Sequence, residues 1–326
     1  MLFKDRKPAA CITDIQTYTI HDGPGIRTEI FFKGCNLNCP WCSNPETKNN
    51  LPQLGIYPNK CIGRDVCSSC LDTCPLANTS PIRFSEDGTV LPFRTPPDCR
   101  SCFQCAESCF AEAIKIWGKI YTIDELMAII LKDRDFYEKS GGGVTLNGGE
   151  VLLQWEFVNL LADALNEKGI NLCIESALNV PWKQAKVLRK ADYVISDLKC
   201  MDSAKHKELI GSGNEQILEN MVRLAEYGVR MVLRTPVVPG INDDEDNIRT
   251  AAQFIKEKLK GSVIQYQLLP YRKIGTEKLD TLGEAYPMAD YTVLGREIWE
   301  PRLRLLTEIA NEYGIPAAAG YETAWK

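Results

Sequence analysis

The chain has 326 residues, 44% of which are apolar, and this is enough for one large domain or for a large and a small one. Its net charge of −5 is a balance of many charges of both signs, which argues against a nucleic-acid-binding surface built on bulk charge. The sequence contains no apolar run of 18 residues, and its start, "MLFKDRKPAACITDIQ", lacks the apolar core of a secretory signal. We therefore predict a cytoplasmic protein without a membrane span.

Strands and helices are predicted to alternate along most of the chain. In chain order they are a strand at 26–34, a helix at 122–138, a strand at 142–150, a helix at 153–169, a strand at 170–176, a helix at 181–190, a strand at 191–199, a helical region at 203–227, a strand at 229–237, a helix at 243–260, a strand at 262–270 and a closing helix at 290–313. Thr122 and Glu125 have the spacing of a capping box at the start of the first helix. Gly169 ends the second helix, at 153–169.

This alternation predicts an α/β fold with a parallel sheet and crossover helices. Six units are too few to close an eight-unit barrel, so we expect a partial (β/α)6 barrel with an open side. In parallel α/β folds, catalytic and ligand-binding residues lie at the carboxyl ends of the strands. Glycine-rich and charged residues stand at those ends, namely Gly34, residues 148–150, Glu175, residues 197–199 and Arg234.

The cysteines point to metal or cluster chemistry. Thiols stay reduced in the cytoplasm, so 14 cysteines favour metal or cluster binding over a disulfide framework. Eleven of them lie between residues 35 and 109. We interpret the other three, Cys11, Cys173 and Cys200, as ordinary buried thiols.

Residues 52–118 interrupt the alternation and are predicted to form an inserted small domain, while residues 1–51 and 119–326 form the partial barrel. With few large apolar side chains, a segment this short needs metal to be stable. Its eight cysteines form two runs, Cys61, Cys67, Cys70 and Cys74, then Cys99, Cys102, Cys105 and Cys109. The second run has the spacing C-x2-C-x2-C-x3-C, and the first ends in the same way after a wider opening gap. Eight thiolates could bind two zinc ions, with four thiolates for each ion, as an alternative to two iron–sulfur clusters.

The doubled spacing resembles bacterial two-cluster ferredoxins, in which the fourth cysteine of each run binds the other cluster. The resemblance implies a ferredoxin-like domain with two auxiliary [4Fe–4S] clusters. One is held by Cys61, Cys67, Cys70 and Cys109, and the other by Cys99, Cys102, Cys105 and Cys74. Phe110 departs from the ferredoxin pattern, which often has proline there, but no ligand is lost.

A separate loop carries only three cysteines, Cys35, Cys39 and Cys42. Three thiolates can each bind a different iron of a cubane, which leaves the fourth iron open to a substrate group. A zinc loop completed by a distant ligand, or a set of redox-sensing thiols, would use the same residues. His21 and His206 are the only histidines, so a site of three cysteines and one histidine has few candidates.

The run "HDGPGIRTEIFFKGCNLNCPWCSNPE" at residues 21–46 resembles the glycyl radical enzyme activating enzymes of the radical S-adenosylmethionine (SAM) superfamily, and the resemblance covers essentially the whole chain. It implies that a reduced cluster on the three-cysteine loop cleaves SAM to methionine and a 5′-deoxyadenosyl radical. That radical takes one hydrogen from a glycine Cα of a partner protein. The inserted domain is typical of the longer members, which activate dehydratases, decarboxylases, and C–C or C–N lyases.

The resemblance also implies a SAM site. Trp41 would pack near the adenine, and Gly148, Gly149 and Glu150 would receive the SAM amino group, with Val151 in place of the family's proline. Arg234 suits the SAM carboxylate, because a guanidinium matches a carboxylate geometrically. Arg272 stands where the family has a histidine that lines the SAM pocket.

Two further strand ends match family positions. Glu175 and Ser176 match an acidic–hydroxyl pair, and Asp197 and Lys199 match a D-x-K motif. Glu175 and Asp197 are implied ligands of a monovalent cation beside the SAM carboxylate. Lys199 would face the ribose or the incoming peptide, and we count it as catalytic with the three loop cysteines. Surface salt bridges, which contribute little, are the alternative interpretation of these charges.

The predicted cofactors are therefore three [4Fe–4S] clusters, SAM and a monovalent cation. The predicted partners are a glycyl radical enzyme, which inserts its C-terminal glycine loop, and flavodoxin or ferredoxin as electron donor. We expect a monomer that binds neither nucleic acid nor membrane. The auxiliary clusters would relay electrons or be structural. A sulfatase-maturase-like peptide modifier and a non-enzymatic iron–sulfur electron carrier are the two alternative functions.

Overall fold

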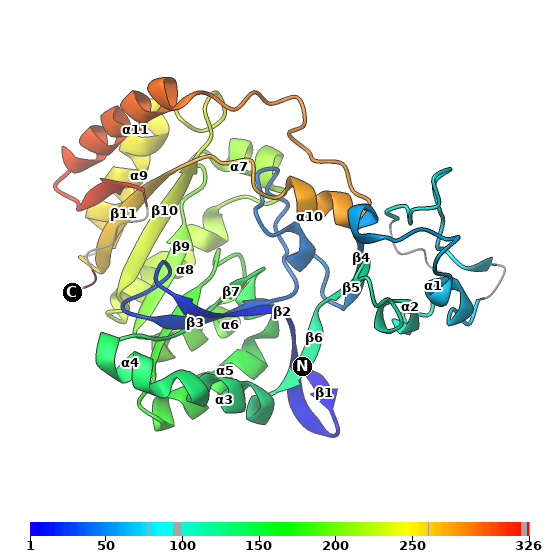
Figure 1. Cartoon of the computed structure of the whole chain (residues 1–326). Coiled ribbons are helices and arrows are strands. Elements are labelled where there is room, and N and C mark those ends of the chain that lie inside the picture. Colours follow the sequence, from blue (N-terminus) through cyan, green and yellow to red (C-terminus); the bar gives the residue numbers. More distant parts are fainter. Residues whose placement is uncertain (77–78, 94–98, 260, 321–324, 326) are drawn as a thin grey trace.

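A ten-stranded mixed sheet dominates the computed structural model, which describes residues 1–76, 79–93, 99–259, 261–320 and 325 (Figure 1). The strand order is β1-β2-β3-β7-β8-β9-β10-β11-β12, with β6 beside β2. The bounds are β1 (Leu2–Lys4), β2 (Lys7–Thr19), β3 (Arg27–Phe32), β6 (Lys119–Thr122), β7 (Gly143–Gly148), β8 (Asn171–Glu175), β9 (Tyr193–Asp197), β10 (Met231–Val237), β11 (Val263–Pro270) and β12 (Ala317–Ala319).

The six predicted strands form the centre of this sheet. β3, β7, β8, β9, β10 and β11 pair in that order, and every one of these pairings is parallel. The sequence analysis missed the antiparallel part, in which β2 pairs with β1, β3 and β6. The 13 residues of β2 alternate between buried and exposed stretches without a clean period, so no strand pattern stands out in the sequence.

The helices of the large domain are α3 (Ile123–Ile130), α4 (Arg134–Ser140), α5 (Trp155–Glu167), α6 (Trp182–Ala185), α7 (Ser203–Ile210), α8 (Glu215–Glu226), α9 (Glu245–Lys258), α10 (Thr276–Thr281) and α11 (Arg296–Asn311). The predicted capping box is present, because Thr122 and Glu125 bond to each other's backbone at the start of α3. The helical region at 203–227 is two helices, since Gly211 adopts φ +90° and ends α7. The closing helix begins at Arg296, six residues later than expected.

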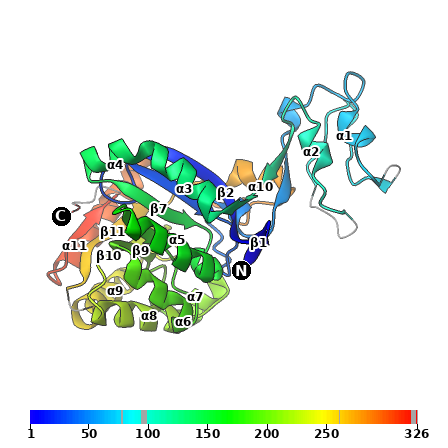
Figure 2. The same ribbon diagram turned by 90° about the horizontal axis from the view of Figure 1, so that it is seen from below.

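Most of these helices pack on one face of the sheet. In Figure 2, α5, α6, α8 and α9 line one side of the strands, and α3 and α4 lie beside β7. The core between them joins strand residues such as Leu146 and Leu233 to helix residues such as Phe157, Leu224 and Leu306. Because the apolar side chains of the strands face this layer, the alternate side chains face the opposite side of the sheet, where the polar residues lie.

A small lobe projects from the large domain (Figures 1 and 2). It is based on the antiparallel pair β4 (Gln53–Ile56) and β5 (Ile114–Trp117), in which Gln53 lies opposite Trp117. Two short helices, α1 (Ser69–Asp72) and α2 (Gln104–Glu107), follow the first cysteines of each run. Residues 77–78 and 94–98 of the predicted insert lie outside the described residues.

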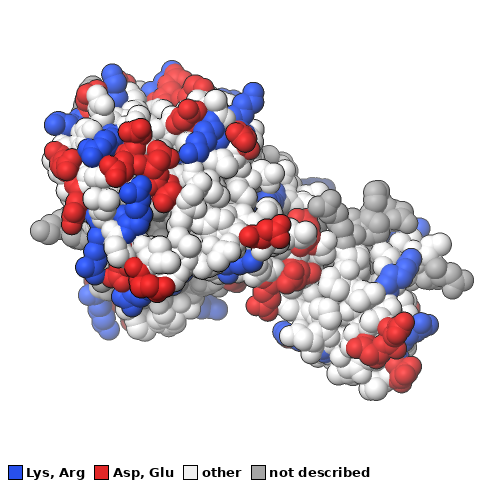
Figure 3. All heavy atoms as spheres, turned by 90° about the horizontal axis from the view of Figure 1, so that it is seen from above, with Lys and Arg blue, Asp and Glu red and all other residues white. Residues whose placement is uncertain are grey.

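Charged side chains of both signs are interspersed over the face of the large domain in Figure 3, whereas the small lobe shows broader uncharged areas. Within the described part of the chain, no helix is long and apolar enough to cross a membrane.

Candidate active site at the strand ends

The three-cysteine loop leaves the end of β3 and folds back on itself. Gly34 begins it with φ +109°, and a Cβ there would lie 2.4 Å from Asn50 Oδ1, so glycine is required. The Gly34 amide donates to Thr47 O at 2.6 Å, and the Cys42 amide donates to Cys39 O at 3.2 Å. The backbone thus ties the two ends of the loop together.

Burial raises the pKa of the loop thiols, that of Cys39 to about 12. The nearby Lys199 ammonium opposes this effect, while the Cys35 and Cys42 thiols add to it, so the thiols lie close enough to influence one another. Thiolates in such a place need a cationic partner, and the irons of a cluster are partners of this kind.

Lys199 and Asp197 form a partly buried ion pair beside this loop. Asp197 is the last residue of β9, and its carboxylate accepts a hydrogen bond from Lys199 Nζ. Burial alone would lower the pKa of Lys199, but Asp197 and the Cys39 thiol outweigh burial and raise it. Lys199 therefore stays a cation next to the thiol loop.

The glycine turn after β7 touches the start of the cysteine loop. The Glu150 amide donates to Gly34 O at 2.7 Å. A Cβ on Gly149 would lie 2.2 Å from the same oxygen, and a Cβ on Gly148 would lie 2.6 Å from Phe32 O. Only glycines permit this approach, so the predicted motif brings the β7 turn and the cysteine loop together.

The Glu150 carboxylate is committed to protein partners. Its Oε1 accepts from the Leu152 amide at 3.0 Å and from Ser176 Oγ at 2.7 Å, and its Oε2 accepts from the Ala177 amide at 2.9 Å. Burial raises the pKa of this carboxyl, and these hydrogen bonds oppose the rise. Glu150 and Ser176 thus join the ends of β7 and β8, and about one acceptor position of the carboxylate is left for a ligand.

Arg234 lies among carboxylates and an amide. Its Nη2 pairs with Asp22 Oδ1 at 2.7 Å, its Nη1 with Glu175 Oε2 at 3.5 Å, and its Nε donates to Gln267 Oε1 at 2.9 Å. Asp22 and Gln267 are residues that the sequence analysis missed as site residues. Asp22 stood in the quoted run at 21–46, whereas Gln267 has no local signal and is placed by its register opposite Arg234.

Glu175 shares this cluster of charges. Burial raises the pKa of the Glu175 carboxyl, the Arg234 guanidinium opposes the rise, and the nearby Asp22 and Asp197 carboxylates add to it. The structure therefore brings Glu175 and Asp197 together at adjacent strand ends, where a cation would relieve their mutual repulsion.

Trp41 and Arg272 lie in contrasting surroundings. Trp41 is buried in an apolar cluster with Leu37, Ile210 and Val238, which fits a packing anchor for the cysteine loop. Arg272 is exposed in the loop after β11, and its side chain has no partner among the residues that the structure describes. The predicted contact of Arg272 with SAM stays a prediction.

The eight cysteines of the small lobe line two cavities. One cavity is lined by Cys61, Cys67, Cys70 and Cys109, and the other by Cys74, Cys99, Cys102 and Cys105. Burial and the neighbouring thiols raise the pKa of Cys70 to about 11 and that of Cys105 to about 12. Each group takes its fourth cysteine from the other run, which is the grouping that the ferredoxin resemblance implies.

No three side chains of His, Cys, Asp or Glu in the described ranges converge closely enough to hold a single metal ion. A cubane makes a different demand, because each thiolate binds a different iron.

Sequence profiles match two parts of the chain. The profile described as "Radical SAM superfamily" matches residues 97–252, and the one described as "4Fe-4S single cluster domain" matches residues 21–70. Together with the thiol loop at the ends of parallel strands, these matches define the class of the protein as the radical SAM enzymes.

Curated relatives narrow the class. The chain is 42% identical to the (2S)-3-sulfopropanediol dehydratase activating enzyme of Klebsiella oxytoca, over 97% of this chain and 98% of that protein. It is 40% identical to the indoleacetate decarboxylase activating enzyme of Tractidigestivibacter scatoligenes, over 87% and 90% respectively. It is 36% identical to the 4-hydroxyphenylacetate decarboxylase activating enzyme of Clostridioides difficile strain 630, over 96% and 97%. The chain belongs to the glycyl radical enzyme activating enzymes.

Proposed function

We propose that this protein generates a glycyl radical on a partner enzyme. Cys35, Cys39 and Cys42 would hold a [4Fe–4S] cluster, which when reduced would supply the electron for cleavage of SAM, and the 5′-deoxyadenosyl group released as a radical would take a hydrogen from a glycine Cα. The observation that carries this proposal is the loop of three thiols beside a buried lysine and a glycine turn, all at the ends of parallel strands. Family membership supports the same reaction.

The strand ends supply binding groups rather than acid–base catalysts. The backbone carbonyls of the glycine turn at 148–149 and the remaining acceptor position of Glu150 suit the SAM amino group. Glu175 and Asp197 suit a monovalent cation, and Lys199 suits the ribose or the incoming peptide. Abstraction of a hydrogen atom needs positioning and exclusion of water more than a general base.

Arg234 has a narrower role than direct recognition of SAM. Asp22, Glu175 and Gln267 are among the neighbours that hold the guanidinium. A bound SAM carboxylate would have to join these neighbours or replace one of them. We propose that Arg234 chiefly fixes the carboxylates around the SAM site.

The small lobe is proposed to be a ferredoxin-like domain with two auxiliary [4Fe–4S] clusters inserted into a partial barrel. The two cavities with four cysteines each support this proposal. The clusters would stabilise the lobe and pass electrons from flavodoxin or ferredoxin.

The partner class follows from the family. The activators of a dehydratase and of a decarboxylase are 42% and 40% identical to this chain, so similarity alone does not select the reaction of the partner. We propose a glycyl radical enzyme that inserts the loop with its target glycine into the open side of the barrel.

Two cysteine variants test the function. Cys39→Ala removes a ligand of the proposed SAM-cleaving cluster, and we expect release of 5′-deoxyadenosine with SAM and dithionite to fall below detection. Cys102→Ala, the matched control in the small lobe, should retain part of this activity because dithionite can reduce the first cluster directly. Normal cleavage by both variants would contradict the cluster assignment. With a candidate partner present, electron paramagnetic resonance should show a glycyl radical only when the first cluster is intact.

A further inference from the structure

The carbonyls of the chain segment after β9 are bound by side chains, while its Leu198 amide continues the strand pairing by donating to Arg234 O at 2.7 Å. All four carbonyls of residues 198–201 accept a hydrogen bond from a buried or partly buried polar side chain. The pairs are Thr235 Oγ1 to Leu198 O at 2.6 Å, Asn242 Nδ2 to Lys199 O at 2.8 Å, and Asn214 Nδ2 to Cys200 O and to Met201 O at 2.9 Å each. Buried backbone groups outside regular structure need such partners, so these side chains define the path of the segment.

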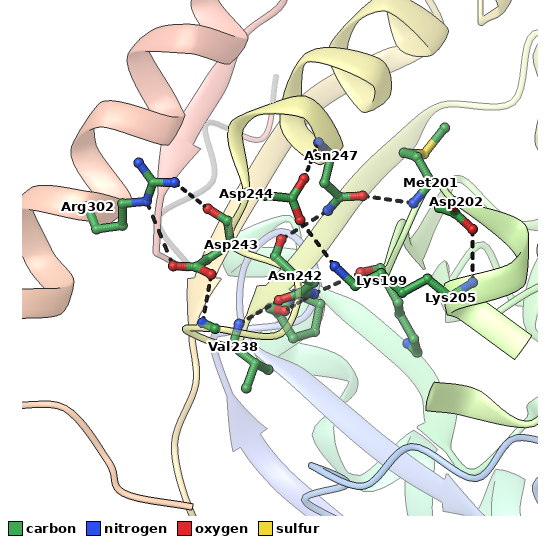
Figure 4. Close-up of polar contacts among 12 residues, drawn as sticks. Lys199, Met201, Asp202, Lys205, Val238, Asn242, Asp243, Asp244, Asn247 and Arg302 are labelled. Atoms are coloured by element: carbon green, nitrogen blue, oxygen red, sulfur yellow. Dashed lines mark hydrogen bonds and ion pairs between the residues drawn. The ribbon is translucent and has the colours of Figure 1, made fainter. Parts of the chain in front are cut away.

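Asn242, like Thr235, links the ends of β9 and β10, and its amide is the donor to the Lys199 carbonyl. Its Nδ2 donates to Lys199 O after β9 and to Pro236 O in β10, both at 2.8 Å, and its Oδ1 accepts from the Val238 amide at 2.7 Å. The residue is fully buried. Figure 4 shows it between the segment that carries Lys199 and the turn at Val238. Asn242 therefore adds a further link between the strand ends that carry Lys199 and Arg234.

The loop that carries Asn242 is itself fixed on both sides. Asn247 donates to Asn242 O at 3.1 Å and accepts from the Met201 amide at 2.8 Å, a second link to the segment after β9. From α11, Arg302 Nη2 donates to Asp243 O at 2.8 Å (Figure 4). These contacts leave the Asn242 amide little freedom to follow a shift of Lys199, so the amide imposes its position on that residue.

On the basis of the function proposed above, we propose that Asn242 is a positioning residue for Lys199. Its hydrogen bond to the Lys199 carbonyl fixes the main chain from which the ammonium reaches Asp197 and the cysteine loop. Loss of this bond lets the lysine move, and a misplacement of about 1 Å at an active site can lower the rate by about 10²-fold.

The substitution Asn242→Asp tests this role, because a carboxylate keeps the size of the side chain but cannot donate to the two carbonyls. Asn220→Asp is a matched control. Asn220 is also fully buried, and its Nδ2 donates to Leu178 O at 2.9 Å and to Val180 O at 2.7 Å, both in the loop after β8. Each variant loses two bonds to buried carbonyls, so we expect similar decreases in melting temperature. Only Asn242→Asp frees the main chain of Lys199.

The readout is SAM cleavage by the iron-loaded, dithionite-reduced enzyme at several SAM concentrations. We expect Asn242→Asp to lower kcat/KM for SAM about tenfold or more relative to Asn220→Asp at equal iron content, with a raised KM. A purely structural role would lower the active fraction and leave KM unchanged. In a Lys199→Met background, the added Asn242→Asp change should have little further effect on kcat/KM.

Equal KM and kcat/KM values in the two asparagine variants would overturn the role of Asn242. If Asn242→Asp does not fold, Asn242→Ser and Asn220→Ser are compared in the same way, since serine retains one donor. Failure of the proposed function is distinguishable, because cleavage of SAM by Cys39→Ala would contradict the function whatever the asparagine variants do.

Discussion

The large domain and the small lobe hold their polar sites in different ways. Among the described residues, 47 buried apolar side chains form the main core of the large domain, whereas the core of the lobe has seven, one of them Cys105. Around the large core, buried amides, hydroxyls and ion pairs fix the strand ends. The lobe has two short strands and eight cysteines around two cavities. The comparison shows that the chain itself builds the first site, and we expect the lobe to depend on what its cysteines bind.

The three-cysteine loop is held in place by the polypeptide itself, although it carries thiols like the lobe. Its backbone is tied to Thr47 and Lys48, and its apolar residues Leu37 and Trp41 are buried. We therefore expect loss of a cluster from this loop to take away chemistry alone, and loss of the proposed auxiliary clusters from the lobe to take away interactions that keep the lobe folded as well.

Removal of iron is expected to have the largest effect, and it tests whether the lobe needs its metal to stay folded while the large domain does not. After chelation, we expect backbone amides of residues 52–118 to lose most of their protection from hydrogen exchange, because seven buried side chains cannot offset the conformational entropy of the lobe. Amides of β7–β11 should keep theirs. Mass spectrometry of peptic fragments reports both regions in one experiment, with iron-saturated chelator as the control. Unchanged protection of the lobe without iron would show that its polypeptide is stable alone.

The next largest effect is expected for a buried charge of the large domain. Arg234→Met leaves Asp22 and Glu175 without their cation, and loss of one partner of a buried ion pair costs roughly 3 kcal/mol. Arg249→Met is the control, because Arg249 also pairs with two carboxylates, Glu245 and Glu312, but is exposed. An exposed ion pair contributes little to stability, so we expect a much smaller loss of unfolding free energy.

Urea unfolding of the holoenzyme, followed by far-ultraviolet circular dichroism, measures this difference in the free energy of unfolding. Equal losses in the two arginine variants would mean that the strand-end site is as solvated as the surface, which would remove the distinction drawn here.

The sequence predicted what depends on local pattern. Six buried strands stand out because each is a short apolar run, and their parallel order follows from the helices between them. The cysteine spacings likewise identify residues that share a loop. The pairing of each run with the fourth cysteine of the other came only from the ferredoxin resemblance, and the two lobe ligand sets stay predictions.

Contacts between distant segments were beyond sequence reasoning. Asp22 and Arg234 are 212 positions apart, and only the order of the strands brings them together. The predicted role of Glu150 had the same weakness, because the sequence does not reveal that Ser176 and two amides already bind its carboxylate. Polar residues at strand ends indicate that a site is present, but the partners of these residues depend on tertiary packing.

The smallest expected effect concerns the junction at which the chain re-enters the large domain from the lobe. It tests whether the two regions unfold independently. Thr122 is the last residue of β6 and caps α3, accepting from the Glu125 amide at 3.3 Å. Thr122→Ala should cost about 1 kcal/mol in the free energy of unfolding of the large domain. Thr307→Ala is the control, since Thr307 only bonds back to Leu303 O within α11, where alanine is a better helix former. Because the large domain is stabilised by its own core, this local loss should leave the iron content and the hydrogen exchange of the lobe unchanged. Loss of iron from Thr122→Ala but not from Thr307→Ala would show instead that the two regions unfold as one unit.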